Sequence, residues 1–404
     1  MRILDVEIGS GIDAISGCAG YGGARALVRR RGVPLGWINM SCSGDEIEAG
    51  DISAAVRHFA NWEARRAAAG DLVQVRSDYS IDQLPPISVI ICTRDRSDLL
   101  ARCLTSLALL DYPAYEVVVV DNAPTSDATR QIAQAAGVRY EREDIPGLDR
   151  ARNRGLAAAR FDIVAYTDDD VEVDSLWLRG IAAAFADPSV QLVTGLVAPG
   201  QMDTEAELYF EMSYGGMGKG TLPARWDRRR LSHRALIGTF HMGVGANMAF
   251  RRSLLESLGG FDPALDVGTL SHGAGDLDIF HRALMSGAVA QYEPRALIRH
   301  YHRRDMEGLR RQLYDNGRAF GVYLISVLRR GAIPRHVTLW YSLRIWLLWR
   351  VGRLIKRLAK RDTLPAPLII GELWGACHAP WAYFATYAEA RARDRAFGRS
   401  GAQT

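Results

Sequence analysis

Three consecutive aspartates, Asp168, Asp169 and Asp170, follow the apolar segment DIVAYT. Side chains alternate along an extended chain, so Asp168 and Asp170 are expected to point to the same side. Two carboxylates that converge on one point repel each other unless a cation lies between them, and a hard divalent ion such as Mg²⁺ or Mn²⁺ is the natural partner. The alternative is a solvated acidic turn at the end of a strand.

A second acidic segment, HGAGDLD at 272–278, begins a predicted helix. Asp276 is expected to cap this helix or to lie in its first turn, where the helix dipole favours the ionised carboxylate. A carboxylate there could accept a proton from a hydroxyl group, although capping alone would explain the residue type.

Two histidines, His300 and His302, lie on either side of a tyrosine and among arginines. Alternate residues of an extended segment share a face, so both histidines could bind a metal ion or a diphosphate group. Each could equally be a structural histidine held by hydrogen bonds. The flanking Arg299, Arg303 and Arg304 favour an anionic ligand.

The elements that would position these residues alternate between strands and helices from residue 87 onward. The apolar, β-branched runs ISVIICT and EVVVVDNA are typical of buried strands in parallel sheets, and helical periodicity separates them. This alternation predicts βαβ units and a mostly parallel sheet. Ligands bind such sheets beyond the carboxyl ends of the strands. The polar residues expected at those ends are Thr93, Arg94, Asp95, Asp121 and the three aspartates.

Three regions are predicted along the chain. Residues 1–84 form a small N-terminal accessory region, residues 85–310 form an α/β domain, and residues 311–404 form a helical C-terminal region. Within the α/β domain we expect a nucleotide-binding half at 85–200 and an acceptor half at 201–310.

A long stretch at 200–245 is polar and glycine-rich and lacks clear periodicity, which is typical of a functional loop. Within it, GGMGKGT at 215–221 resembles a phosphate-binding loop, but glycine follows the lysine where Ser or Thr would be required. We therefore predict a mobile loop at the acceptor site.

The composition excludes several classes of protein. The chain of 404 residues is 48% hydrophobic, which excludes a disordered protein, and its net charge of +4 predicts no partner. Five cysteines without metal-type spacing fit a reduced, cytoplasmic setting. We find no apolar signal segment after Met1, and no run approaches the roughly 18 uncharged apolar residues of a membrane-spanning helix.

Basic residues concentrate toward the C-terminus, where residues 328–361 contain ten Lys or Arg and no Asp or Glu. Within 333–361, Trp, Leu and Ile alternate with arginines at helical spacing. We expect an interfacial helix on an anionic membrane, at the inner face of the cell membrane. The alternative is a helix packed on the domain with a basic outer face. Nucleic-acid binding is not expected, because nothing else in the chain resembles a base-reading module.

Six motifs in order across residues 86–305 resemble the family 2 glycosyltransferases, which are inverting enzymes with the GT-A fold. The motifs are ISVIICTRDR, VVVVDNAPTSDAT, GLDRARNRGLAAA, YTDDDVEVDSLWL, GANMAFRRSLLESLGGFD and GAGDLDIFHRAL. The resemblance implies a nucleoside-diphosphate sugar donor, a Mn²⁺ or Mg²⁺ ion at a D-x-D motif, and a glycan or lipid-linked acceptor.

The resemblance also implies a role for each matching residue. Asp276 becomes the base that deprotonates the acceptor hydroxyl, and Asp170 binds the metal ion together with Asp168 and His302. The residues implied at the donor are Thr93, Arg94, Asp95, Asp121, Arg152, Asn153, Asp168 and Asp169, and those on the acceptor side are Asn247 and Asp278.

The expected function is the transfer of a single sugar, with inversion, from a nucleoside-diphosphate sugar to a hydroxyl acceptor in glycan, polysaccharide or glycolipid synthesis. A UDP-sugar is the default donor, and single transfers are expected because no QxxRW motif of processive synthases follows Arg304. One departure is Gly275, which stands where the family commonly has a glutamate before the base; Asp278 is a candidate substitute. The second hypothesis is therefore a catalytically silent GT-A-like sugar-nucleotide-binding or scaffold protein of a polysaccharide-assembly complex.

Overall fold

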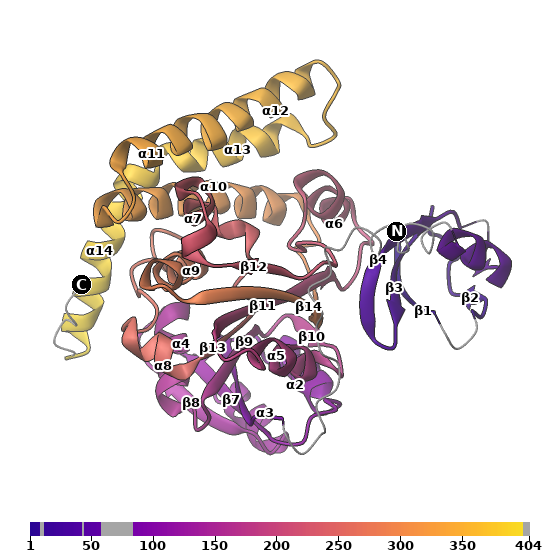
Figure 1. The fold of residues 1–404 in the computed structure, drawn as a ribbon, viewed down its shortest axis with the longest axis horizontal. Coiled ribbons are helices and arrows are strands. Elements are labelled where there is room, and N and C mark those ends of the chain that lie inside the picture. Colours follow the sequence, from indigo (N-terminus) through magenta and orange to yellow (C-terminus); the bar gives the residue numbers. More distant parts are fainter. Residues whose placement is uncertain (9–11, 43, 58–83, 399–404) are drawn as a thin grey trace.

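The computed structural model describes residues 1–8, 12–42, 44–57 and 84–398. These residues form a central sheet covered by helices, a small N-terminal sheet beside it, and a layer of C-terminal helices across one end (Figure 1). The sequence also predicts a helix at 46–69; its described part begins at residue 49, after strand β5 Glu46–Ile47, and residues 58–69 lie outside the described residues.

The central sheet contains nine strands in the order β10-β14-β11-β13-β9-β6-β7-β8, with β12 paired to β14. Strands β6, β7, β8, β9, β11 and β14 run in one direction, while β10, β12 and β13 run against them. The expectation of a mostly parallel sheet is confirmed. The strands are β6 Ile87–Thr93, β7 Tyr115–Asn122, β8 Arg139–Glu143, β9 Ile163–Asp168, β10 Val171–Val173, β11 Val190–Pro199, β12 Ala224–Trp226, β13 Asn247–Arg251 and β14 Val289–His300.

Helices cover both faces of this sheet, which explains why its strands are apolar without alternation. In β6, Ile87, Val89 and Ile91 pack into the core beneath α2 and α5, whereas Ile90 packs into the core beneath α4 and α9. The sequence predicts helices at 97–110, 125–136, 149–159, 175–186, 251–258 and 276–286, and all six are present with ends shifted by up to three residues. They are α2 Ser97–Leu107, α3 Ala128–Ala135, α4 Leu148–Ala158, α5 Trp177–Phe185, α8 Arg252–Ser257 and α9 Gly275–Ser286.

The stretch at 200–245 is more ordered than its lack of periodicity predicted. Its elements are too short to show a helical repeat in the sequence, because none spans more than two turns. They are helix α6 Glu205–Leu208, a π-helical turn Tyr209–Tyr214, strand β12, 3₁₀ turns at Arg228–Arg230 and Thr239–His241, and helix α7 His233–Ile237.

The N-terminal region is a three-stranded sheet in the order β1-β3-β4, with a two-stranded ribbon of β2 and β5. Arg29 on β3 forms an ion pair with Asp174 at 2.6 Å, and the Thr221 hydroxyl donates to the Leu35 carbonyl at 2.8 Å. The small sheet thus supports the glycine-rich segment at 215–221. The strands are β1 Arg2–Glu7, β2 Ile15–Ser16, β3 Ala24–Arg30, β4 Val33–Met40 and β5 Glu46–Ile47.

The C-terminal helices pack on one another through glycines. A Cβ added at Gly317 would lie 1.9 Å from the Glu372 carbonyl oxygen, and one added at Gly375 would lie 1.9 Å from the Tyr314 carbonyl oxygen. Helices α10 and α13 therefore approach backbone to backbone. The helices are α10 Met306–Arg330, α11 Arg335–Trp340, α12 Leu348–Leu358, α13 Ala366–Cys377 and α14 Ala379–Ala396, with a π-helical segment Tyr341–Leu347 between α11 and α12. In the part of the chain that the structure describes, no helix is both long and apolar enough to cross a membrane.

We predict that Gly317→Ala lowers the free energy of unfolding by about 1–3 kcal/mol, because a backbone oxygen blocks the added methyl group and the helices must separate. Gly352→Ala in α12 is the matched control, since nothing lies within 4 Å of its added Cβ. The control should be neutral or more stable by up to about 1 kcal/mol. Urea denaturation of both variants checks this, and equal stabilities would contradict the close α10–α13 contact.

Candidate active site

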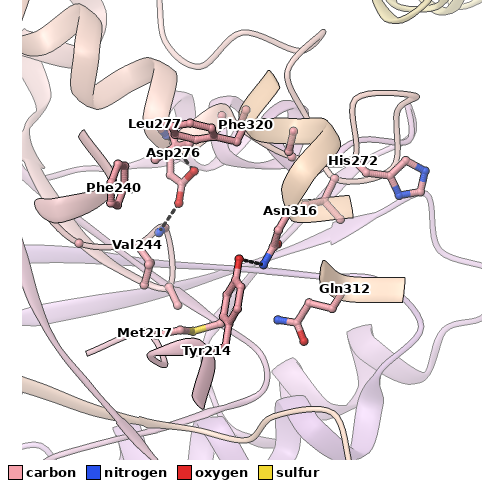
Figure 2. A pocket seen from close by; sticks show the side chains of 18 of the residues that line it. Tyr214, Met217, Phe240, Val244, His272, Asp276, Leu277, Gln312, Asn316 and Phe320 are labelled. Atoms are coloured by element: carbon pink, nitrogen blue, oxygen red, sulfur yellow. Dashed lines mark hydrogen bonds between the residues drawn. The ribbon is translucent and has the colours of Figure 1, made fainter. Parts of the chain in front are cut away.

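A pocket with a volume of about 720 Å³ lies between the sheet edge where β9 ends and the C-terminal helices. Asp168 at the end of β9 and Asp276 at the start of α9 both line it, although 108 residues separate them in the sequence. Figure 2 shows Asp276 on one side of the pocket, facing residues of the 214–217 segment and of α10. The structure thus brings together two of the three acidic positions expected to carry the chemistry.

Asp168, Asp170 and His300 form a cluster whose potential ligand atoms all lie within 4.8 Å of one another. The cluster forms because β9 ends at Asp168 and the chain turns directly into β10, which pairs antiparallel with β14 so that Val171 lies opposite His300. The His300 Nε2 atom then lies 3.2 Å from Asp170 Oδ1. Two carboxylates and an imidazole are a donor set that suits Mn²⁺ or Mg²⁺.

The middle aspartate is held separately from this cluster. Asp169 is buried, and its carboxylate accepts hydrogen bonds from the Thr93 hydroxyl at 2.7 Å and from Arg96 at 3.1 Å. Arg96 also reaches Asp170, at 3.4 Å. The repulsion among three neighbouring carboxylates is thus offset by one hydroxyl and one arginine, which leaves Asp168 and Asp170 available to a ligand.

Burial and the neighbouring charges shift the pKa values of Asp168, Asp170 and His300. Burial and the Asp170 charge raise the pKa of Asp168 to about 6, against the opposing effect of Arg152. Burial also acts to raise the pKa of Asp170, but the neighbouring His300 and Arg96 hold it at about 2. The Asp170 carboxylate in turn raises the pKa of His300 despite its burial. Asp170 is therefore the group that remains ionised across the physiological range.

Asp276 lies in the first turn of α9, as expected from its position in the sequence. Its Oδ2 accepts a hydrogen bond from the Gly245 backbone N–H at 2.9 Å, and its Oδ1 accepts one from the Leu277 backbone N–H at 2.8 Å (Figure 2). Two fixed backbone donors therefore orient a carboxylate that lines the pocket.

A carboxylate that the sequence analysis did not single out, Asp149 on α4, lies against the start of α9. A Cβ added at Gly275 would lie 1.9 Å from Asp149 Oδ2, and that oxygen is buried without a hydrogen-bond partner among the described residues. Asp149 Oδ1 accepts a hydrogen bond from Arg152 at 2.9 Å. Burial raises the pKa of Asp149 to about 7, and Arg152 opposes the shift. The space of a side chain at position 275 is thus filled by an acid from another helix.

Arg152 connects the two acidic groups of the pocket. It is buried, donates to Asp149, and lies 4.0 Å from Asp168. Burial opposes its charge, but Asp149 and Asp168 outweigh burial and raise its pKa. Arg152, which the resemblance places at the donor, is therefore a buried cation held between Asp149 and Asp168.

Asn153, Asn247 and Asp278 are not among the residues that line the pocket. Asn153 exchanges two hydrogen bonds of 2.8 Å with the Phe261 backbone, and Asn247 accepts one of 2.9 Å from the Trp177 indole. Asp278 is fully buried in ion pairs with two arginines of α9 and α10. Their contacts in this structure hold the fold around the pocket, so Asp278 is not positioned to replace an acid at 275.

The second histidine of the pair lies next to the cluster rather than in it. The His302 ring stacks on His300 with centroids 5.0 Å apart, while its Nε2 lies 2.7 Å from Glu211 Oε1. His300, not the expected His302, contacts Asp170. The alternation of side chains predicted the shared face of the two histidines but could not say which of them meets the aspartates.

The remaining donor-side positions lie at the ends of β6 and β7. Arg94 is exposed, and Asp95 has a positive φ of 52° and accepts hydrogen bonds from the Thr125 backbone and hydroxyl at 3.0 and 2.9 Å. Asp121 is buried and accepts a hydrogen bond from the Tyr140 hydroxyl at 3.0 Å. Arg94 and Asp95 follow β6 and Asp121 lies near the end of β7, at the same sheet edge as Asp168. Arg96 is an additional cation at this edge that was not predicted from the sequence.

Comparison with known proteins gives one family match. Residues 88–259 match the model of "Glycosyl transferase family 2". The chain is 28% identical over 277 residues to the pre-mycofactocin glycosyltransferase of Mycobacterium tuberculosis, covering 68% of this chain and 54% of that protein. It is 27% identical over 187 residues to glycosyltransferase AglE of Haloferax volcanii, covering 44% of this chain and 56% of that protein.

The chain therefore spans about half the length of these curated relatives. Among solved structures, it is similar to the mannosyltransferase PcManGT from Pyrobaculum calidifontis in complex with GDP-Man and Mn²⁺. The sequence identity is 21%, the TM-score is 0.47, and 87% of each chain is covered.

We predict that Gly275→Ala lowers the free energy of unfolding by about 1–3 kcal/mol, because the added methyl group displaces the Asp149 carboxylate from Arg152. Asp149→Ala should itself destabilise, since it leaves the buried Arg152 without this partner. The double variant should be more stable than the sum of the two losses implies, with a coupling of about 0.5–3 kcal/mol. Chemical denaturation of the full cycle measures this coupling, and strictly additive losses would contradict the contact.

Proposed function

We propose that this chain, which belongs to glycosyltransferase family 2 through residues 88–259, transfers a single sugar from a nucleoside-diphosphate sugar to a hydroxyl acceptor with inversion. A UDP-sugar is the proposed donor, and the acceptor is a glycan or a lipid-linked molecule. The observation that carries the proposal is that Asp168 belongs both to the cluster with Asp170 and His300 and to the pocket lined by Asp276.

On the donor side, Asp168, Asp170 and His300 would hold Mn²⁺ or Mg²⁺, with His302 beside them through its stacked ring. When bound, such an ion stabilises the negative charge that builds on a diphosphate leaving group. The buried Arg152 adds a cation on the pocket side of the same cluster. The proposed nucleotide contacts are Thr93, Arg94, Asp95, Asp121, Arg152, Asp168 and Asp169, while Asn153 would support them through its hydrogen bonds to the Phe261 backbone.

On the acceptor side, Asp276 would take the proton of the attacking hydroxyl. The acceptor oxygen forms a bond to the anomeric carbon while the bond from that carbon to the diphosphate oxygen breaks, and the proton passes to Asp276. One in-line displacement of this kind inverts the anomeric carbon. The backbone N–H groups of Gly245 and Leu277 support the role, because they fix the direction of the carboxylate.

The second hypothesis is a catalytically silent sugar-nucleotide-binding or scaffold protein. Its only support is Gly275, which stands where the family commonly has a glutamate. The position of Asp149 weakens it, because a carboxylate from α4 fills the space of the missing side chain. The acidic neighbour of Asp276 is therefore relocated rather than lost, which supports catalysis.

We further propose that the protein works at the cytoplasmic face of the cell membrane, through an apolar and basic surface on 333–361. Residues 328–361 contain ten Lys or Arg and no Asp or Glu. Among the described residues only three of these ten, Arg330, Arg350 and Arg353, form ion pairs within 4.0 Å. An anionic membrane would attract such a surface. Its exposed apolar side chains are Leu339, Trp340, Leu343, Leu347, Leu348, Trp349, Val351, Ile355 and Leu358.

For the chemistry, we predict that Asp170→Asn abolishes Mn²⁺-dependent donor binding, whereas Asp276→Asn retains binding and slows donor hydrolysis by about a hundredfold or more. Thermal stabilisation by a panel of UDP-, GDP- and dTDP-sugars measures binding. A donor at 100 times its dissociation constant should add about 2.7 kcal/mol to stability. Asp127→Asn, at an exposed aspartate of the same domain, is the control and should change neither property. Equal loss of donor binding and of donor hydrolysis in Asp170→Asn and Asp276→Asn would overturn the separate roles proposed for these two aspartates.

For the membrane, we predict that the protein floats with vesicles rich in anionic lipid, binds zwitterionic vesicles more weakly, and dissociates as salt rises. Replacing Leu348, Val351 and Ile355 by serine should weaken binding at least about tenfold, because these exposed side chains share one face of α12. Leu109→Ser is the control, at a leucine that is 72% exposed in another part of the chain. Unchanged flotation of the triple variant would show that α12 does not meet the membrane.

A further inference from the structure

Two helices begin at the pocket, and each carries an aspartate in its first turn. Asp149 lies in the first turn of α4 and Asp276 in the first turn of α9, and both line the pocket. The dipole at each helix start favours the ionised form of its aspartate. Arg152, one turn further along α4, lines the same pocket. The structure thus places two carboxylates and one guanidinium where two helices begin.

Arg152 and Asp276 both approach Gly245 closely. A Cβ added at Gly245 would lie 2.7 Å from Arg152 Nη2 and 3.3 Å from the Asp276 Cβ atom. The Asp276 charge acts on the Arg152 guanidinium across this short gap. Among the described residues, however, the ion pairs of Arg152 within 4.0 Å are those with Asp149 and Asp168. Arg152 and Asp276 are therefore neighbours that do not pair.

Asp149 holds the Arg152 guanidinium in this arrangement. Its Oδ1 accepts a hydrogen bond from Arg152 Nη1 at 2.9 Å, and both side chains are buried, with exposed fractions of 1% and 6%. A buried charge without a partner is costly, so Arg152 would turn to another carboxylate if Asp149 were removed. Asp276, beside Gly245, is a carboxylate that Arg152 could then reach.

A second buried acid, Asp266, lies near Asp149 and is the weaker acid of the two. A Cβ added at Gly147 would lie 2.4 Å from Asp266 Oδ2, so Asp266 lies against the start of the same helix. Burial and the charge of Asp149 raise the pKa of Asp266 well above its usual range. Of the two acids, Asp149 is therefore the one that ionises first, and it does so next to Arg152.

The arrangement matters because a carboxylate that acts as a base works best without an arginine partner. An arginine within about 4–6 Å favours the charged form of a carboxylate and so makes it a weaker proton acceptor. The carboxylate oxygens of Asp276 instead accept hydrogen bonds from the backbone N–H groups of Gly245 and Leu277. These neutral donors orient the carboxylate without placing a full positive charge on it.

We propose that Asp149 is a positioning residue for this base: by holding Arg152, it keeps the guanidinium from pairing with Asp276. This inference rests on the proposed function, because it needs Asp276 to act as the base. An acidic side chain at 275 could hold Arg152 from α9, since a Cβ added at Gly275 would lie 1.9 Å from Asp149 Oδ2. Gly275 is helical and has no positive φ, so its backbone allows a longer side chain once Asp149 is shortened.

Moving the acid from α4 to α9 tests this inference. In Asp149→Ser, the kcat of Mn²⁺-dependent donor hydrolysis should fall at least about tenfold, with a smaller change in donor affinity. The donor is whichever UDP-, GDP- or dTDP-sugar stabilises the wild-type protein most. The double variant Asp149→Ser/Gly275→Glu should recover most of the lost kcat, because its new carboxylate can hold Arg152. Asp149→Ser/Gly275→Gln is the matched control, which fills the same space without a charge and should recover little.

Thermal unfolding shows which variants are folded. If Asp149→Ser does not fold, Asp149→Asn, which keeps the shape of the side chain, should show the same fall in kcat. The inference is overturned if the folded Asp149 variant hydrolyses donor as fast as the wild type. It is also overturned if glutamine at 275 restores kcat as well as glutamate does, or if the folded glutamate variant recovers nothing. A wild-type protein that binds or hydrolyses no donor refutes the proposed function itself.

Discussion

Three carboxylates at the end of one buried strand repel one another, and the architecture around them follows from how that repulsion is offset. The Asp169 carboxylate accepts hydrogen bonds from Thr93 and Arg96, so the burial of its charge costs little free energy. Asp168 and Asp170 are left facing His300, where a divalent cation would remove the remaining repulsion. The pairing of β10 with β14 matters because it supplies that histidine. The same sheet edge thus presents a donor set that a divalent cation would stabilise.

Arg152 links this edge to the side of the pocket that carries Asp276. It lies between Asp168 and Asp149, and Asp149 packs against Gly275 at the start of the helix that carries Asp276. The end of β9 and the start of α9 are therefore connected through Arg152 and Asp149 of α4. The position of Asp276 depends on this contact as well as on its own backbone hydrogen bonds.

Much of the fold follows from local patterns, because buried β-branched runs and amphipathic segments are properties of short stretches of chain. The first-turn position of Asp276 and the presence of two histidines on one side of a strand follow in the same way. What the sequence could not predict depends on contacts between distant segments. The register of β14 against β10 selects His300 over His302, and the packing of α4 on α9 brings Asp149 to Gly275. The burial of Asp278 by arginines of two helices is equally long-range.

We propose that Asp168, Asp170 and His300 hold the divalent ion at the edge of the pocket that contains Asp276. Crystals soaked with MnCl₂ and a nucleoside diphosphate would test it through an anomalous difference map recorded at the manganese edge. We predict a single strong peak among these three side chains, with the diphosphate on its pocket side. A bound diphosphate whose manganese peak lies elsewhere, or which has none, would contradict the account.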